Sequence, residues 1–160
     1  MDKKSAGILL YRFKNKTIEF FLVHPGGPFF IKKDLGIWSI PKGEFAEPEN
    51  PFGAALREFK EETGIDLSGE PIELSSIKQK SGKQVFAWAI EGDLDPQKIV
   101  SNTFSLEWPP KSGKFRDYPE IDKGEWFNYK TAKEKINPAQ ILLIDELVKK
   151  LKLPDKQISG

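Results

Sequence analysis

Residues 43–65, GEFAEPENPFGAALREFKEETGI, are the stretch on which the fold depends. The second half of this stretch predicts a short helix with well-marked ends. Asn50 suits the N-cap, and Pro51 suits the first helical position, where no amide hydrogen is needed. Gly64 suits the left-handed residue that ends a helix. We therefore expect a helix that begins at Pro51 and stops just before Gly64.

This predicted helix has an apolar face and an acidic face. At about 100° per residue, the apolar face comprises Phe52, Ala55, Leu56 and Phe59, and the adjacent face comprises Glu58, Glu61 and Glu62. Like charges at this spacing cost about 0.2–0.5 kcal/mol each, and the helix dipole disfavours anions near its C-terminus. A hard divalent cation would reverse both effects, because Mg²⁺ and Mn²⁺ prefer oxygen ligands. The alternative is a solvated charged face in which Arg57 pairs with Glu61.

The spacing of this segment resembles the signature of the Nudix hydrolases. Gly43, five residues, Glu49, seven residues and then REFKEETGI match every fixed position of that signature, which we call the Nudix box. Phe59 is bulkier than the aliphatic residue that is usual at its position. The resemblance implies an α/β fold, namely an α/β/α sandwich with a mixed central sheet and a loop–helix–loop motif. It also implies an enzyme that cleaves a diphosphate linked to another moiety.

The same resemblance implies roles for individual residues. Glu58, Glu61 and Glu62 would be catalytic ligands of Mg²⁺ or Mn²⁺, and the carbonyl of Gly43 would supply a further ligand. Glu49 and Arg57 would form a buried pair that fixes the loop to the helix.

An acidic residue outside the box is also expected at the site. Glu120 lies six residues before Trp126 and resembles the loop carboxylate that many Nudix enzymes place opposite the helix, where it holds metal or takes a proton from water. Three nearby carboxylates compete for this role: Asp117, Asp122 and Glu125.

Length and composition are consistent with a single domain over residues 1–160. Charged residues make up 31% of the chain and the formal net charge is +1, so no bulk field attracts nucleic acid or membrane. The predicted partner is a small nucleotide. The absence of cysteine excludes disulfides and thiolate chemistry. Because no signal peptide or apolar span is visible, we expect a cytoplasmic protein.

The rest of the chain predicts strands and one further helix around the box. The expected strands cover residues 5–13, 17–24, 37–40, 71–80, 83–90 and 125–129, and the expected helix covers residues 138–151. The first two strands are almost continuously apolar, which is typical of a sheet covered on both faces. Residues 91–124 are expected to be a long irregular segment with a functional role. His24, the only histidine, ends a strand beside a Pro-Gly-Gly turn, which favours a structural or solvent-facing role over a catalytic one.

Aromatic and basic residues in two loops are candidates for substrate binding. In residues 25–36, Phe29 and Phe30 precede two lysines and either stack on a base or plug the end of the sheet. Lys42 precedes the box and suits phosphate contact, although a solvated lysine is the alternative. The predicted substrate-binding residues are Phe30, Lys32, Lys42, Lys111, Lys114 and Tyr118.

A second resemblance indicates the class of substrate. Residues 5–150 resemble a bacterial branch of nucleoside-polyphosphate pyrophosphohydrolases close to the diadenosine tetraphosphate hydrolases. The tyrosine common downstream of the box in those hydrolases is missing at residues 81–83, as is the proline typical of ADP-ribose enzymes. A dinucleoside polyphosphate is the leading substrate, and a nucleoside triphosphate is the alternative. A binding module without catalysis is the third reading, disfavoured because all box glutamates are present.

Overall fold

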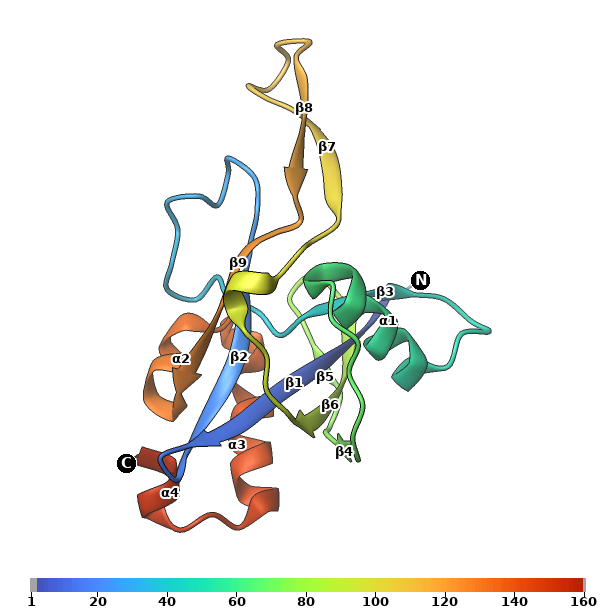
Figure 1. The fold of residues 1–160 in the computed structure, drawn as a ribbon. Helices are drawn as coiled ribbons and strands as arrows, with labels where there is room; N and C mark the ends of the chain where they lie inside the picture. Colours follow the sequence, from blue (N-terminus) through green and yellow to red (C-terminus); the bar gives the residue numbers. More distant parts are fainter. Residues whose placement is uncertain (1–2, 160) are drawn as a thin grey trace.

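The computed structural model describes residues 3–159, and its centre is a mixed β-sheet with helices on both faces (Figure 1). The sheet strands are β1 (Lys4–Lys14), β2 (Thr17–Pro25), β3 (Lys42–Phe45), β4 (Ile72–Glu73), β5 (Ile77–Lys78), β6 (Gln84–Glu91) and β9 (Ile121–Asn128). Their main order is β4-β6-β1-β2-β9, while β3 pairs with β1 and β5 pairs with β6. β1 and β6 run parallel and the other pairs run antiparallel. The expected mixed sheet is confirmed.

Helices cover the two faces of the sheet. The helices are α1 (Pro51–Thr63), α2 (Tyr129–Lys135), α3 (Ile141–Leu151) and α4 (Asp155–Ser159), with short 3-10 turns η1 (Pro96–Lys98) and η2 (Pro138–Gln140). α1 packs on one face, and α2 and α3 pack on the other. Among residues 3–159, no helix is long and apolar enough to cross a membrane.

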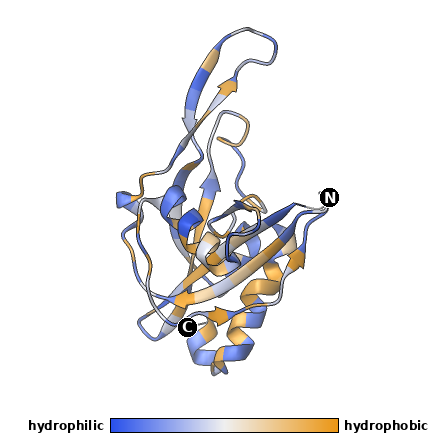
Figure 2. Ribbon diagram, turned by 90° about the vertical axis from the view of Figure 1, so that its right-hand side faces the viewer, coloured by the Kyte–Doolittle hydropathy of each residue, from blue (hydrophilic) through white to orange (hydrophobic). Residues whose placement is uncertain are grey.

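The two cores explain why β1 and β2 are almost continuously apolar. In β1, Ile8 and Leu10 face the core under α1, whereas Leu9 and Tyr11 face the core under α3. Figure 2 shows the hydrophobic residues concentrated in the sheet and on the helices packed against it. Each large apolar side chain that is fully buried stabilises the fold by about 1.5–3 kcal/mol.

The box helix has the ends that the sequence predicts. The Asn50 side chain accepts a hydrogen bond from the Gly53 amide at 3.1 Å, and Pro51 occupies the first turn. Gly64 adopts the left-handed conformation with φ 78°, and its amide donates to the Lys60 carbonyl at 2.7 Å. Phe59 is buried on the face that packs against β1. These contacts fix the axial position of the acidic face.

Several expected elements differ in the structure. Residues 37–40 are not a strand: Trp38 bridges to Ile136 and Ser39 to Val23, so the segment crosses between two partners instead of following one. The expected strand at 71–80 is interrupted between β4 and β5, where the Ser75 amide donates to the carboxylate of Glu146. The expected helix at 138–151 begins as the 3-10 turn η2, and α2 and α4 were not predicted.

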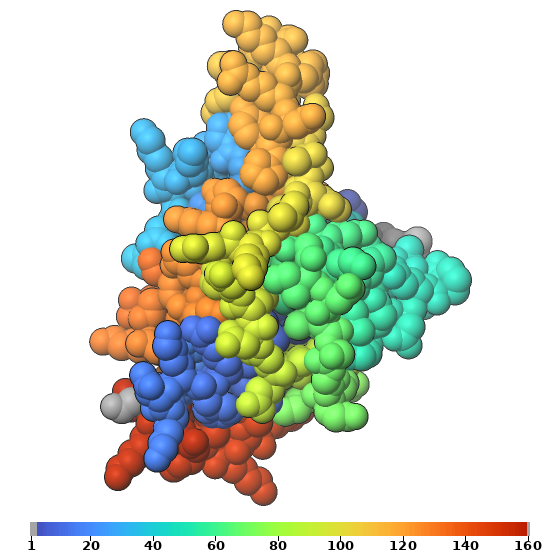
Figure 3. Space-filling model, in the orientation of Figure 1, coloured from blue at the N-terminus to red at the C-terminus, as the bar shows by residue number. Residues whose placement is uncertain are grey.

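The prediction of an irregular segment at 91–124 is wrong. It contains a two-stranded hairpin, β7 (Thr103–Glu107) with β8 (Phe115–Pro119), and β9 begins at Ile121 instead of residue 125. The hairpin projects from the body as an arm, defined as residues 103–119 (Figures 1 and 3). Most arm residues are exposed, and β8 shows no burial periodicity; only the short alternation of β7, TFSLE, marks a strand in this part of the sequence.

Candidate active site

The three glutamates on the acidic face of α1 have different surroundings. Glu62 is buried, Glu58 keeps 12% of its side chain exposed, and Glu61 keeps 39% exposed. Burial raises the pKa of Glu62 to about 8; the nearby Lys42 opposes this rise, and Glu58 and Glu120 add to it. Burial also raises the pKa of Glu58, where the Arg57 guanidinium opposes the rise. Both carboxylates are therefore costly to ionise without a compensating positive charge.

Gly43 lies against the carboxylate of Glu58. It belongs to β3 and is paired with Ala6 of β1. A Cβ atom at position 43 would stand 1.9 Å from an oxygen of Glu58, so only glycine leaves room for this carboxylate. The structure thus brings the first and the central positions of the box into direct contact.

Arg57 connects the loop of the box to its helix. Its Nε and Nη2 donate to the two oxygens of Glu49 at 2.7 and 2.9 Å, and its Nη1 donates to Glu58 at 2.9 Å and to Glu61 at 3.1 Å. The expected pairing is present, but the expectation of a buried pair is wrong, because 39% of Arg57 and 33% of Glu49 are exposed. The pair is partly exposed because the loop that carries Glu49 is itself mostly exposed at residues 46–50.

Arg57→Ala is therefore expected to destabilise the protein only modestly. A half-exposed ion pair contributes about 1 kcal/mol, compared with about 3–5 kcal/mol for a buried pair that loses one partner. Urea unfolding of the metal-free variant would measure the change in the free energy of unfolding. A loss above about 3 kcal/mol would contradict this description of the loop.

Backbone hydrogen bonds bring Glu120 to the box helix. The Asn102 amide donates to the Glu61 carbonyl at 3.0 Å, and the Glu120 amide donates to the Asn102 carbonyl at 2.8 Å. The Gly26 amide then donates to the Glu120 carbonyl at 2.8 Å. Because Asn102 and Glu120 flank the two ends of the arm, the arm begins and ends beside α1. This relay was not predicted, because backbone bonds leave no residue pattern in the sequence.

The competing carboxylates have other surroundings. Asp117 lies on β8 opposite Ser105, within the arm. Asp122 is bonded to His24 at 2.8 Å, and Glu125 is an exposed residue of β9. Glu120, in contrast, adds to the negative charge that raises the pKa of Glu58 and Glu62.

Lys42 lies within the acidic group. Its backbone amide hydrogen-bonds to Glu62, and its side chain has Glu62, Glu44 and Glu58 as electrostatic neighbours. Burial lowers the pKa of Lys42, and the nearby ammonium of Lys83 lowers it further. Sequence reasoning missed Lys83, which lies immediately before β6 and pairs with Glu44 at 3.7 Å.

The other predicted substrate-binding residues belong to the loop at residues 26–37 and to the arm, two segments that lie at the same end of the molecule (Figure 3). Phe30 is half-buried in the loop at residues 26–37, with its ring 4.9 Å from the ring of Phe29. Lys32 is an exposed residue of the same loop. Tyr118 packs beside Phe104 at the base of the arm. Lys111 and Lys114 are exposed in the turn between β7 and β8, at the far end of the arm from Glu120.

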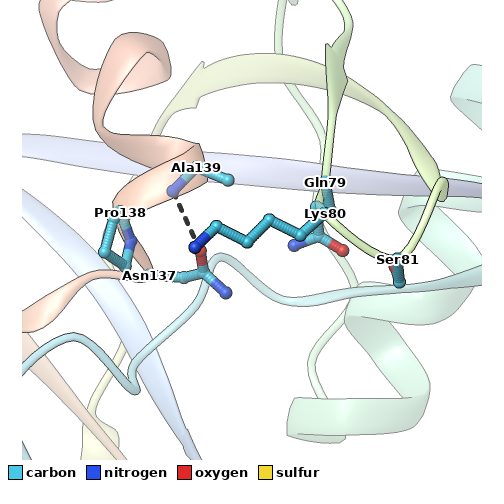
Figure 4. A pocket seen from close by; sticks show the side chains of 6 residues that line it. All are labelled: Gln79, Lys80, Ser81, Asn137, Pro138 and Ala139. Atoms are coloured by element: carbon cyan, nitrogen blue, oxygen red, sulfur yellow. Dashed lines mark hydrogen bonds between the residues drawn. The ribbon is translucent and has the colours of Figure 1, made fainter.

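A separate hollow of about 340 Å³ lies next to the turn that joins β5 and β6. It is lined by residues of the β5–β6 turn and of η2: Gln79, Lys80, Ser81, Asn137, Pro138 and Ala139 (Figure 4). Figure 4 shows the Lys80 side chain extending across it toward Asn137. Its volume is in the range of small-molecule sites, and its lining offers amide groups and one cation.

Comparison with known proteins decides the family. A model of the NUDIX domain matches residues 1–147. The chain belongs to the NUDIX domain family. The asymmetrical bis(5'-nucleosyl)-tetraphosphatase of Rattus norvegicus is 32% identical over 103 residues, which cover 57% of this chain and 66% of the relative. Nudix hydrolase 5 of Arabidopsis thaliana is 40% identical over 104 residues, which cover 60% of this chain and 33% of that protein. The chain thus spans less than two thirds of either relative.

A solved structure also shares the Nudix fold. The binary complex of the C. elegans Ap4A hydrolase superposes with a TM-score of 0.65 at 21% identity, covering 92% of this chain and 98% of that chain. At this identity the likeness establishes the fold alone.

The carboxylates of Glu58, Glu61 and Glu62 suit a hard divalent cation. Their donors are all oxygens, and the ionised forms of Glu58 and Glu62, which burial disfavours, are the forms that a cation stabilises. Within residues 3–159, no three acidic or histidine side chains are grouped so as to hold a metal by themselves. Water, the Gly43 carbonyl and substrate phosphates would have to complete the shell, as is usual for Mg²⁺.

Proposed function

We propose that this chain is a metal-dependent hydrolase of nucleoside polyphosphates that prefers a dinucleoside polyphosphate such as diadenosine tetraphosphate. The observation that carries the proposal is the group of Glu58, Glu62 and Glu120, whose mutual repulsion a divalent cation would relieve. The rat relative, named as an asymmetrical tetraphosphatase, supports the choice of substrate.

The proposed roles of the residues follow from their surroundings. Bound Mg²⁺ or Mn²⁺ would supply charge neutralisation of the phosphates and a lowered pKa for water. Glu58, Glu61, Glu62 and the Gly43 carbonyl would hold the metal, and Glu120 would accept the proton of the attacking water or hold a further ion. Arg57 orients Glu58 and Glu61 through its Nη1 and ties them to Glu49. Correct position and charge supply most of the catalysis in phosphoryl transfer.

The lysines and aromatic rings would hold the rest of the substrate. Lys42 lies among the carboxylates and is placed to contact a phosphate beside them. Phe30 and Tyr118 offer one base platform at the arm, and the hollow beside Ser81 has room for a second nucleoside. Lys32 would contact the phosphate chain, whereas Lys111 and Lys114, at the far end of the arm, would attract the anionic substrate by their charge. A dinucleotide can use two such places, whereas a mononucleotide can use one.

A substrate panel tests this proposal. We expect a higher kcat/KM for diadenosine tetraphosphate than for ATP, with ATP and AMP as the products of an asymmetrical cut, because only the dinucleotide can occupy the platform at the arm and the hollow beside Ser81 at the same time. Chromatography of products with Mg²⁺ present is the measurement. Phe30→Ala or Tyr118→Ala should raise KM for the dinucleotide at least about fivefold, and less for ATP.

Other outcomes of the panel would change the assignment. Equal or better turnover of ATP or dGTP would favour the triphosphate alternative. Tight nucleotide binding without any product would favour a regulatory module that does not cleave its ligand.

A further inference from the structure

His24 is buried and makes two hydrogen bonds that the proposed catalysis does not use. Only 1% of its surface is exposed. Its Nδ1 lies 2.8 Å from a carboxylate oxygen of Asp122, and its Nε2 lies 2.7 Å from the backbone carbonyl of Lys33. The ring also stands edge-on to Trp38, with 5.1 Å between ring centroids.

Both partners of the ring are acceptors. Each bond uses a different ring nitrogen, and the two acceptors belong to different segments of the chain. No apolar ring of similar size can bond to both acceptors in this way. A buried ring without these bonds would leave polar groups unsatisfied, which is costly.

The two bonds join three segments that meet beside Glu120. His24 ends the regular pairing of β2 with β9, because the register shifts between His24 and Pro25. Two residues after His24, the Gly26 amide donates to the Glu120 carbonyl, and Asp122 lies two residues after Glu120. The His24–Asp122 hydrogen bond therefore lies two residues from the Gly26–Glu120 hydrogen bond along both segments.

The backbone at Gly26 packs tightly against the residue before Glu120. A Cβ atom at position 26 would stand 2.0 Å from the Pro119 carbonyl oxygen, so the two backbones are in direct contact. A rotation of the segment that carries Glu120 would have to break either this contact or the bonds of His24.

We propose that His24 is a positioning residue that holds Glu120 opposite the box helix by fixing the contact between Gly26 and Glu120. The consequence for catalysis rests on the proposed role of Glu120, whereas the structural tie does not. The hydrogen bond to Asp122 fixes His24 to β9, and the hydrogen bond to the Lys33 carbonyl connects it to the loop at residues 26–37.

Amide hydrogen exchange in the metal-free protein tests the tie directly. In His24→Phe, which keeps the aromatic contact with Trp38 but donates no hydrogen bond, protection of the Gly26 amide should fall at least about tenfold. Protection of the Gly64 amide, bonded to Lys60 at the end of α1, should be unchanged. If His24→Phe does not fold, Asp122→Ala makes the same test. Unchanged protection of Gly26 would overturn the proposal.

A double-mutant cycle tests the consequence for catalysis. His24→Phe should lower kcat about tenfold with KM within about twofold, and should have no further effect on kcat in a Glu120→Gln background. Additive losses would show that His24 does not act through Glu120 and would overturn the positioning role. If Glu120→Gln alone keeps full kcat, the proposed role of Glu120 fails, while hydrogen exchange still decides the tie.

Discussion

Glu62→Gln is expected to lower kcat about a hundredfold or more while the fold persists. The substitution keeps the size of the side chain and an oxygen that can accept from the Lys42 amide, but removes the negative charge. Loss of a charged metal ligand at a phosphoryl-transfer site removes stabilisation that operates in the transition state, so kcat should fall more than KM rises. Steady-state kinetics on the preferred substrate is the measurement. A kcat within about threefold of wild type would exclude Glu62 from the metal site.

The stability of the same variant serves as its control. The pKa of Glu62 is raised from 4.5 to about 8 by burial, so its contribution to stability is complete below pH 4.5 and is lost as the pH rises through about 8. Glutamine cannot ionise and does not suffer this loss. In EDTA at about pH 9, Glu62→Gln should therefore be at least as stable as wild type. A lower melting temperature at that pH would mean that unfolding, and not chemistry, explains the lost activity.

Gly43→Ala should inactivate the enzyme with little effect on stability. The new methyl group would stand 1.9 Å from Glu58, whose carboxylate is the end of a flexible side chain and can move away. Moving a metal-binding carboxylate by about 1 Å costs about a hundredfold in rate. We expect that loss in kcat together with a melting temperature within a few degrees of wild type.

Gly53→Ala is the matched control for this substitution. Gly53 lies in the first turn of the same helix, and a Cβ atom there would meet its nearest neighbour at an ordinary 3.9 Å. Alanine in a helix is favoured over glycine by about 0.5–1 kcal/mol, so this variant should keep wild-type activity and gain slight stability. Equal activity of the two variants would show that the substitution Gly43→Ala does not displace Glu58.

The sequence predicted the parts of the structure that are encoded by local patterns. Asn50, Pro51 and Gly64 marked the ends of α1, because caps depend on neighbouring residues only. The apolar runs of β1 and β2 predicted a sheet covered on both faces, and Ile8 and Leu9 indeed face opposite cores. The spacing of the box predicted the family, which the comparison confirms.

The features that sequence reasoning missed depend on contacts between distant segments. The exposure of Arg57 depends on where the loop at residues 44–50 lies, which no local pattern encodes. The relay from Glu61 through Asn102 to Glu120 uses backbone groups, which every residue shares. The arm exposes most of its side chains, so β8 lacks the alternation that burial would impose, and the alternation of β7 covers only five residues.

The central claim is that the acidic face of α1 is a metal-dependent catalytic site. Its most direct test is product release from diadenosine tetraphosphate by the wild-type protein in excess EDTA, followed by titration with Mg²⁺ or Mn²⁺. We predict no turnover in EDTA and full recovery with either ion, because Glu58 and Glu62 hold the substrate's phosphates only through a cation. Full turnover in excess EDTA would contradict the account.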